Sequence, residues 1–422
     1  MARAIKDSGI EWIGEIPENW NCYPSKYIFS EIKALRKLND VRMTSSIKYG
    51  IISQEDYRRI ENFNVIDASK DLDKWKHVEP YDFVISLMSF KSGLEMSEVS
   101  GCVTWHYIVI RAIQPIHPYY YKWLFKSTLY CTALSRTSNF IRNGQDLRFS
   151  NFVQVPLPYP PLSEQQAIAV FLNQKCSEID ALMADVQAQI ETLEQYKRSV
   201  ITKAVTKGLN PNVPMKAVDS VWITEIPATW QFMKAGYLFV ERSVRAKGDE
   251  TPLSLSQKDG LVITDEMTEH AMKSKTYDGW KKVWVNDLVL NRFKAHLGVF
   301  FCSKYNGMVS FHYGVYVPIS KLNVKFYEYL FHSKPYCEMF ADLSNGITVG
   351  LQNLGNAYFY SAKCVYPSPA EQDRIVEYLD AKCAEIDAII DGKRQQLAVL
   401  EEYKKSVIFE YVTGKKEVFT YA

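Results

Sequence analysis

The chain has 422 residues, of which 47% are hydrophobic and 23% charged, and its formal net charge at pH 7 is +2. This length and apolar content allow two domains with their own cores, so disorder is not expected. No apolar run approaches the roughly 18 to 20 residues of a membrane-spanning helix, and Met1 to Trp20 carries charged side chains where a signal peptide would be apolar. We therefore expect a cytoplasmic protein.

Two parts of the sequence repeat each other. Glu164 to Thr206 returns without a gap 207 positions later as Glu371 to Thr413, with 20 of 43 positions identical. A shorter repeat precedes each copy, since WIGEIPENW at Trp12 to Trp20 matches WITEIPATW at Trp222 to Trp230 in six of nine positions. The chain is thus a tandem duplication of a globular half followed by a long helix, which suits a ligand with two half-sites.

In chain order, we predict a first globular half (1–159), a first repeat helix (160–208), a linker with a second globular half (209–366), and a second repeat helix with a tail (367–422). The halves read as mixed α and β, which makes the fold class α+β. Strand-like runs occur at Asp82 to Met88, Tyr107 to Ile110, Asp287 to Leu290 and Gly314 to Val317, and helical runs at Tyr120 to Leu134 and Phe326 to Phe340.

The repeat helices carry a heptad pattern that predicts a coiled coil, most simply formed by the two helices pairing with each other. Lys393 at a d position is the one breach of the apolar seam, and Ser163 is the better of the two expected N-caps. The spacer seam comprises Leu172, Cys176, Ile179, Met183, Val186, Ile190, Leu193 and Val200 in the first helix, and Leu379, Cys383, Ile386, Ile390, Leu397, Leu400 and Val407 in the second.

Catalytic and metal-binding motifs are absent from the sequence. It has no Gly-x-x-x-x-Gly-Lys-Ser/Thr loop, no Gly-x-Gly-x-x-Gly after a strand, and no Asn-Pro-Pro-aromatic or Asp-Pro-Pro-aromatic tetrapeptide of an adenine methyltransferase. The eight cysteines form no Cys-x-x-Cys pair, so we expect packing thiols, and we expect His106 and His312 to be structural. We assign no catalytic residue, no metal site and no cofactor to this chain.

Polar and basic clusters are the candidates for a ligand-binding surface. Each globular half carries a net +3 charge, whereas both repeat helices are acidic. Arg, Lys, Asn and Gln on loops are the side chains that grip phosphates and read base edges in DNA. The candidate DNA-binding residues are Arg36, Lys37, Arg42, Arg136, Arg142, Asn143, Gln145 and Arg148 in the first half, and Arg242, Arg245, Lys247, Arg292, Lys294, His296, Asn345, Gln352 and Asn353 in the second.

The chain resembles the specificity subunit (HsdS) of type I restriction-modification systems. The resemblance lies in the openings SGIEWIGEIPENW and DSVWITEIPATW, the helix entries PPLSEQQAIAVFL and PSPAEQDRIVEYL, the cores KCSEIDAL and KCAEIDAI, and the ends LEQYKRSVI and LEEYKKSVI. It spans nearly the whole chain. The second half departs from the family in entering its helix through YFYSAKCVYPSPAEQ rather than through a smooth proline-rich segment.

The resemblance implies two target-recognition domains, each reading one half of a bipartite site in double-stranded DNA, held apart by an antiparallel coiled coil. It implies that two methyltransferase subunits (HsdM) bind this subunit and bring S-adenosylmethionine, and that a restriction and translocase subunit (HsdR) joins them. Two other functions remain open on the residues alone. One is a stand-alone two-headed DNA-binding regulator, and the other is a coiled-coil protein adaptor without a DNA role.

Overall fold

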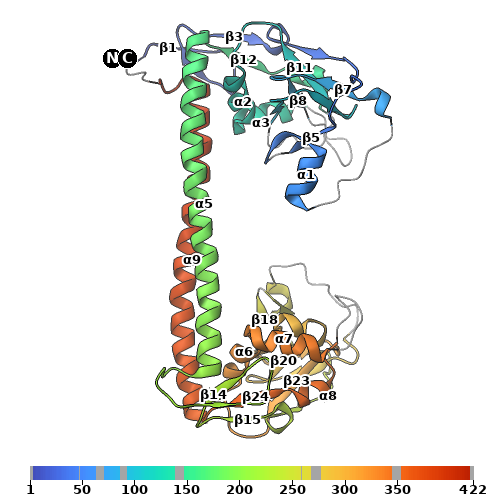
Figure 1. Ribbon diagram of the computed structural model, residues 1–422, viewed down its shortest axis with the longest axis vertical. Helices are drawn as coiled ribbons and strands as arrows, with labels where there is room; N and C mark the ends of the chain where they lie inside the picture. Colours follow the sequence, from blue (N-terminus) through green and yellow to red (C-terminus); the bar gives the residue numbers. More distant parts are fainter. Residues whose placement is uncertain are drawn as a thin grey trace. The chain divides into compact units, whose positions relative to one another are not determined.

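The computed structural model describes residues 3–46, 48–62, 71–85, 93–137, 147–257, 259–267, 277–344 and 353–418. They form two compact units, one of Met1–Val186 with Gln395–Ala422 and one of Gln187–Arg394. The boundaries fall inside the two long helices, so each unit combines one head with a part of both helices (Figure 1). This arrangement confirms the α+β class with tandem mixed heads on repeat helices.

The first head is built on a four-stranded antiparallel sheet in the order β4-β11-β8-β9. Three further pairs, β1-β2, β12-β3 and β5-β6, and the pair β10-β7 surround it. The strands are β1 Ile5–Asp7, β2 Glu15–Pro17, β3 Asn21–Pro24, β4 Phe29–Ile32, β5 Met43–Ser46, β6 Gly50–Ser53, β7 Lys76–Val78, β8 Phe83–Ile85, β9 Glu95–Met96, β10 Gly101–Val103, β11 Ile108–Ala112 and β12 Pro156–Tyr159.

Alternation along the central strands separates two cores. Phe83 and Ile85 of β8 face the large core, while Val84 between them faces a smaller cluster with Met43 and Val103. Figure 1 shows α2 and α3 beside the sheet, and their aromatic side chains fill the large core. The helical segments are η1 Ser25–Tyr27, α1 Gln54–Glu61, η2 Leu72–Lys74, α2 Pro118–Lys126, α3 Thr128–Arg136 and α4 Phe149–Phe152.

The second head repeats this plan with the sheet order β16-β23-β20-β21. Its surrounding pairs are β13-β14, β15-β24, β17-β18 and β19-β22. The strands are β13 Met215–Ala217, β14 Glu225–Pro227, β15 Gln231–Lys234, β16 Phe239–Glu241, β17 Leu253–Ser256, β18 Gly260–Ile263, β19 Lys281–Val283, β20 Leu288–Asn291, β21 Phe300–Cys302, β22 Gly307–Val309, β23 Tyr313–Pro318 and β24 Lys363–Tyr366. The helical segments are η3 Ala235–Tyr237, η4 Thr264–Glu266, η5 Arg292–Leu297, α6 Val324–His332, α7 Lys334–Leu343 and α8 Asn356–Ser361.

Both predicted helical runs of the heads are split by a serine. Ser127 separates α2 from α3, and Ser333 separates α6 from α7, each with an extended backbone. The hydroxyl of Ser127 donates to the Leu124 carbonyl at 2.8 Å, and that of Ser333 to the Leu330 carbonyl at 2.6 Å. A buried serine thus ends one helix by binding its last turn, and the chain turns into the next.

The repeat helices are α5 Leu162–Lys207 and α9 Pro369–Val412. Helix α5 begins one residue before Ser163, which is therefore not its N-cap, whereas Ser368 lies before α9 and accepts the Glu371 amide at 3.4 Å. Gly208 ends α5 in the left-handed region at φ 76°, as the Gly-rich breaker after the first repeat predicts. The spacer seam residues are all buried or half-buried, and α9 continues without a break through Lys393.

All eight cysteines are free thiols, and burial raises the pKa of the Cys176 thiol to about 11. Among the described residues, no helix is both long and apolar enough to cross a membrane. Within the same ranges, no three His, Cys, Asp or Glu side chains are grouped as a metal site would require.

Candidate nucleic-acid interface

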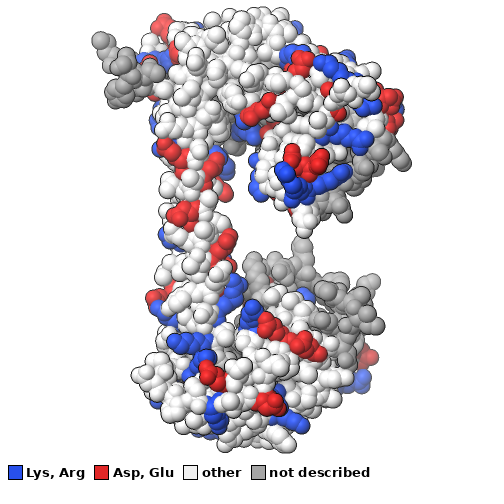
Figure 2. Space-filling view, viewed as in Figure 1, with Lys and Arg blue, Asp and Glu red and all other residues white. Residues whose placement is uncertain are grey.

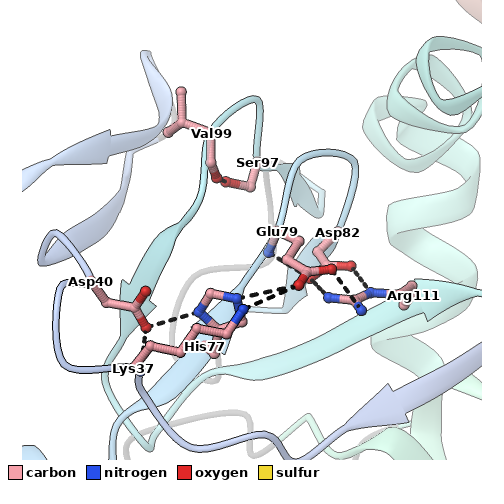
Figure 3. A network of polar contacts seen from close by, with 8 residues as sticks. All are labelled: Lys37, Asp40, His77, Glu79, Asp82, Ser97, Val99 and Arg111. Atoms are coloured by element: carbon pink, nitrogen blue, oxygen red, sulfur yellow. Dashed lines mark hydrogen bonds and ion pairs between the residues drawn. The ribbon is translucent and has the colours of Figure 1, made fainter.

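The segment that joins β4 to β5 in the first head carries three of the candidate basic residues, Arg36, Lys37 and Arg42. Asp40 closes it into a turn, because its carboxylate accepts the Lys37 amide at 2.7 Å. The same carboxylate contacts Nδ1 of His77 at 2.8 Å, and both side chains are less than 10% exposed (Figure 3). The turn is therefore held against strand β7 by the contact between Asp40 and His77, while the Lys37 side chain stays exposed.

The second head has the same turn with a different clamp. Lys247 corresponds to Lys37, and Glu250 accepts the Lys247 amide at 2.9 Å. The strand register places Lys282 where the first head has His77, and its amine lies 2.6 Å from the Glu250 carboxylate. The pKa of Glu250 is lowered to about 2, mainly because the Lys282 amine donates a hydrogen bond to its carboxylate. Each head thus presents an exposed lysine on a turn held by a carboxylate.

A buried aspartate precedes the central strand of each head. Asp82 accepts two hydrogen bonds from Arg111, at 2.6 and 2.8 Å, and Arg111 also lies 2.9 Å from Glu79 (Figure 3). These contacts raise the pKa of Arg111, mainly through Asp82. In the second head Asp287 accepts a hydrogen bond from Arg242, which directly follows β16, whereas Arg111 of the first head lies in β11. The guanidinium of Arg242 also lies 4.2 Å above the ring of Trp284.

The other second-head candidates differ in how freely their side chains are presented. Arg292 is bound to Glu241 at 2.8 Å and to Asn356 at 2.7 Å, so its guanidinium already has two protein partners. Arg245 lies on the surface, 3.6 Å from Asp278. Lys294 and Asn353 are exposed, and His296 is half-buried. The structure therefore offers Lys247, Lys294 and Asn353 most openly.

In the first head, Arg136 ends α3 and lies 3.2 Å from Glu11, with both side chains largely exposed. Arg148 stands at the N-cap position of α4. The candidates Arg142, Asn143 and Gln145, and in the second head Asn345 and Gln352, lie outside the described residues. Of the two polar segments that the sequence singled out, only the ends thus lie within the described residues.

Two exposed aromatic turns recur at matching places and were not recognised as surface features from the sequence. Trp105 stacks on His106 at 3.5 Å between β10 and β11, and Phe311 lies 3.9 Å from His312 between β22 and β23. Trp105 is 45% exposed and Phe311 53%. The recurrence of an aromatic residue before each histidine was the available signal. These rings add a stacking surface to each head.

The helix pair repeats one ion pair in both units. Lys197 of α5 lies 2.6 Å from Asp387 of α9, and the repeat-equivalent Lys404 of α9 lies 2.6 Å from Asp180 of α5. Both lysines occupy a positions of the heptad, where a charged residue fixes the register at a cost in stability. Because α5 contributes the lysine in one unit and the aspartate in the other, the helices pair as an antiparallel coiled coil.

Comparison with known proteins agrees with this architecture. Residues 36–192 match the model of the type I restriction modification DNA specificity domain. A proposed type I restriction enzyme MjaX specificity subunit of Methanocaldococcus jannaschii is 24% identical over 97% of this chain and 96% of its own length. The MjaVIII specificity subunit of the same organism is 35% identical over 83 residues, which are 20% of this chain and 18% of that protein.

A solved chain from a study of complex assembly in a type I restriction-modification system has a similar fold. It is 12% identical, with a TM-score of 0.67 over 95% of this chain and 99% of that chain. The family model, the relative aligned along almost the whole length, and the duplicated heads on antiparallel helices lead to one conclusion. Along almost its whole length the chain is similar to a specificity subunit of a type I restriction-modification system, and its residues 36–192 match the DNA specificity domain of those systems.

Proposed function

We propose that the two heads read the two halves of a bipartite site in double-stranded DNA. The observation that carries this proposal is the repeated turn of Lys37 and Lys247, which has one backbone design but different neighbours in each head. Shared lysines supply contacts to phosphates, while the differing side chains around them supply the selection of bases. Two heads with one fold can thus read two different sequences.

Mapping of adenine methylation across the genome, in cells with and without this chain, tests the proposal. We expect an interrupted sequence motif that is methylated only when the chain is present. Arg148→Ala should then weaken recognition of one half of that motif by about 1 to 3 kcal/mol if the guanidinium meets a base edge. The matched control is Arg394→Ala on the exposed surface of α9. An uninterrupted motif, or equal losses in both variants, contradicts the two-head reading.

The methyl transfer itself belongs, in this proposal, to two methyltransferase subunits (HsdM) that carry S-adenosylmethionine, and DNA cutting to a restriction subunit (HsdR), all in the cytoplasm. The helix pair offers a repeated surface for two identical partners. Tyr196 and its repeat equivalent Tyr403 are 50% and 48% exposed, and Leu182 and its equivalent Ile389 are 55% and 44% exposed. All four occupy g positions, beside the seam, where charged residues are usual.

Substitution of the repeated tyrosines tests this docking surface. Tyr196→Ser or Tyr403→Ser should each release one methyltransferase subunit, and the double variant both, because exposed aromatic anchors dominate such contacts. The mass of the purified complex, measured by light scattering, reports the stoichiometry. The matched control is Val399→Ser, since Val399 is 67% exposed on α9 but has no apolar equivalent in α5. Full complexes from the double variant would place the docking surface elsewhere.

A further inference from the structure

A basic groove lies in the second unit, where α5 meets α7. It has a volume of about 740 Å³ and is lined by Arg198, Lys203 and Lys207 of α5 and by Lys334 of α7, with Glu338 as its one acidic residue. Figure 2 shows Lys and Arg side chains gathered where the helix pair meets this head. The hydroxyl groups of Ser199 and Thr202 line the same groove. An anionic ligand is the chemistry that such a lining fits.

Part of this positive charge is not neutralised by the protein. Lys207 lies 2.8 Å from Glu225, and Lys334 lies 3.7 Å from Glu338 across a largely exposed contact. For Arg198 and Lys203, the described residues provide no carboxylate within ion-pair distance. Surface charges are usually interspersed with opposite ones, so two unpaired cations in one hollow indicate a site for an external anion.

The duplication of the chain supplies an internal comparison for this groove. In the first unit the repeat places Lys405 at the position of Arg198 but Glu410 at that of Lys203, and α3 has Thr128 where α7 has Lys334. The charges that remain there are paired, Lys405 with Glu402 at 2.7 Å and Glu410 with Lys416 at 2.8 Å. At the described positions of the first unit that correspond to the groove, the basic lining of the second unit is therefore not repeated.

This asymmetry decides which kind of ligand fits. A partner that docks twice, once on each repeat, needs features that both units share, as Tyr196 and Tyr403 are shared. A bipartite DNA site has two different halves, so a contact present on one unit is compatible with it. From Arg198 to Lys207 the helix rises about 14 Å, which matches about four steps of duplex at 3.4 Å each.

We propose that the groove between α5 and α7 binds the phosphate backbone of DNA next to the half-site read by the second head, without reading bases. The proposal rests on the proposed function, since it assumes that this head holds DNA. Arg198 and Lys203 each neutralise a phosphate, and Ser199 and Thr202 donate hydrogen bonds to phosphate oxygens. The groove adds sequence-independent affinity and makes DNA binding by the complex more sensitive to salt.

The test is the salt dependence of DNA binding by the assembled methyltransferase. The probes are a duplex that carries its methylated motif and a duplex of scrambled sequence. Each phosphate contact contributes about 0.9 to the slope of log affinity against log salt concentration. The Arg198→Gln, Lys203→Gln double variant should therefore lose about 1.8 from this slope. Between 50 and 200 mM salt its affinity should fall about 12-fold less than that of the unchanged complex.

The matched control removes the same charge elsewhere, through Lys405→Gln together with Lys382→Gln, because both lysines are paired with glutamates on the α9 surface. The control should leave the slope unchanged. Interference by ethylation of single phosphates locates the contact, and the affected phosphates should lie beside the second half-site. Discrimination between the motif and single-base mismatches should stay the same in the groove variant.

Three outcomes overturn the inference. An unchanged slope with a folded, fully assembled groove variant shows that the groove does not contact DNA. Loss of a methyltransferase subunit with an unchanged slope in the remaining complexes identifies the groove as a protein-docking surface. A slope change equal to that of the control shows only an effect of net charge. If the unchanged complex does not distinguish the motif from the scrambled duplex, it is the proposed function that fails, not the groove assignment alone.

Discussion

The attachment of each head to its long helix depends on one buried glutamine, and removal of that glutamine should be costly. Gln165 in the first turn of α5 accepts the His117 amide at 2.8 Å and donates to the Pro160 carbonyl at 2.9 Å. The repeat-equivalent Gln372 of α9 accepts the Asn323 amide at 2.8 Å and donates to the Pro367 carbonyl at 2.9 Å. Both side chains are 0% exposed.

Gln165→Ala leaves one amide and one carbonyl without a partner and opens a small cavity. A buried polar group that loses its hydrogen bond costs about 1 to 3 kcal/mol. Because the His117 amide is only partly buried, we expect a loss of about 2 to 4 kcal/mol in the free energy of unfolding. Gln372→Ala should cost about the same in the second unit. The two losses should add, since the two sites lie in different compact units and share no partner.

Urea unfolding followed by tryptophan fluorescence measures these effects, because Trp20 and Trp230 are buried in the cores that the two glutamines adjoin. A loss of about 3 kcal/mol corresponds to a midpoint shift of about 1 M. The control is Gln174→Ala, since Gln174 is exposed on α5 and contacts only Glu178 at 3.0 Å. It should change stability by less than about 0.5 kcal/mol. A loss below about 1 kcal/mol for either buried glutamine would refute the reasoning.

Three further predictions concern the heads and are each measured by urea unfolding. His77→Lys should be tolerated, because Lys282 already occupies the equivalent place in the second head. His77→Leu leaves the buried Asp40 carboxylate without its imidazole partner and should cost about 1 to 3 kcal/mol. Equal losses for the two variants would contradict the idea that a basic side chain at this position holds the turn in both heads. Asp82→Ala should cost about 3 kcal/mol by isolating part of the Arg111 charge, and a neutral result would show that Glu79 replaces it. The pKa of Glu250 is lowered to about 2, so the stability that its carboxylate contributes is fully present above its ordinary pKa near 4.5 and is lost as the pH falls toward 2. The difference in the free energy of unfolding between the unchanged protein and Glu250→Gln should therefore shrink over that pH range, and a constant difference would exclude this linkage.

The sequence by itself determined the features that depend on local periodicity. The heptad pattern predicted both repeat helices nearly to their ends, because α5 and α9 each bury one stripe of side chains that recur every 3.5 residues on average. Strand-like runs of residues located the central strands, and the duplication implied two heads of one fold. Even Gly208 ended its helix as expected, since only glycine adopts the left-handed backbone there without strain.

Only the tertiary structure decided how the polar residues are used. Arg292 and Arg242 look in sequence like free cations for DNA, but the fold binds them to Glu241 and to Asp287. The exchange of His77 for Lys282 becomes visible only when the strand registers are aligned. The basic groove likewise unites α5 with α7, whose residues lie more than a hundred positions apart. The partner of a charged side chain is known only from the folded structure, because an ion pair depends on distance in space. Helix and strand patterns, in contrast, depend on residues that are close together in the sequence.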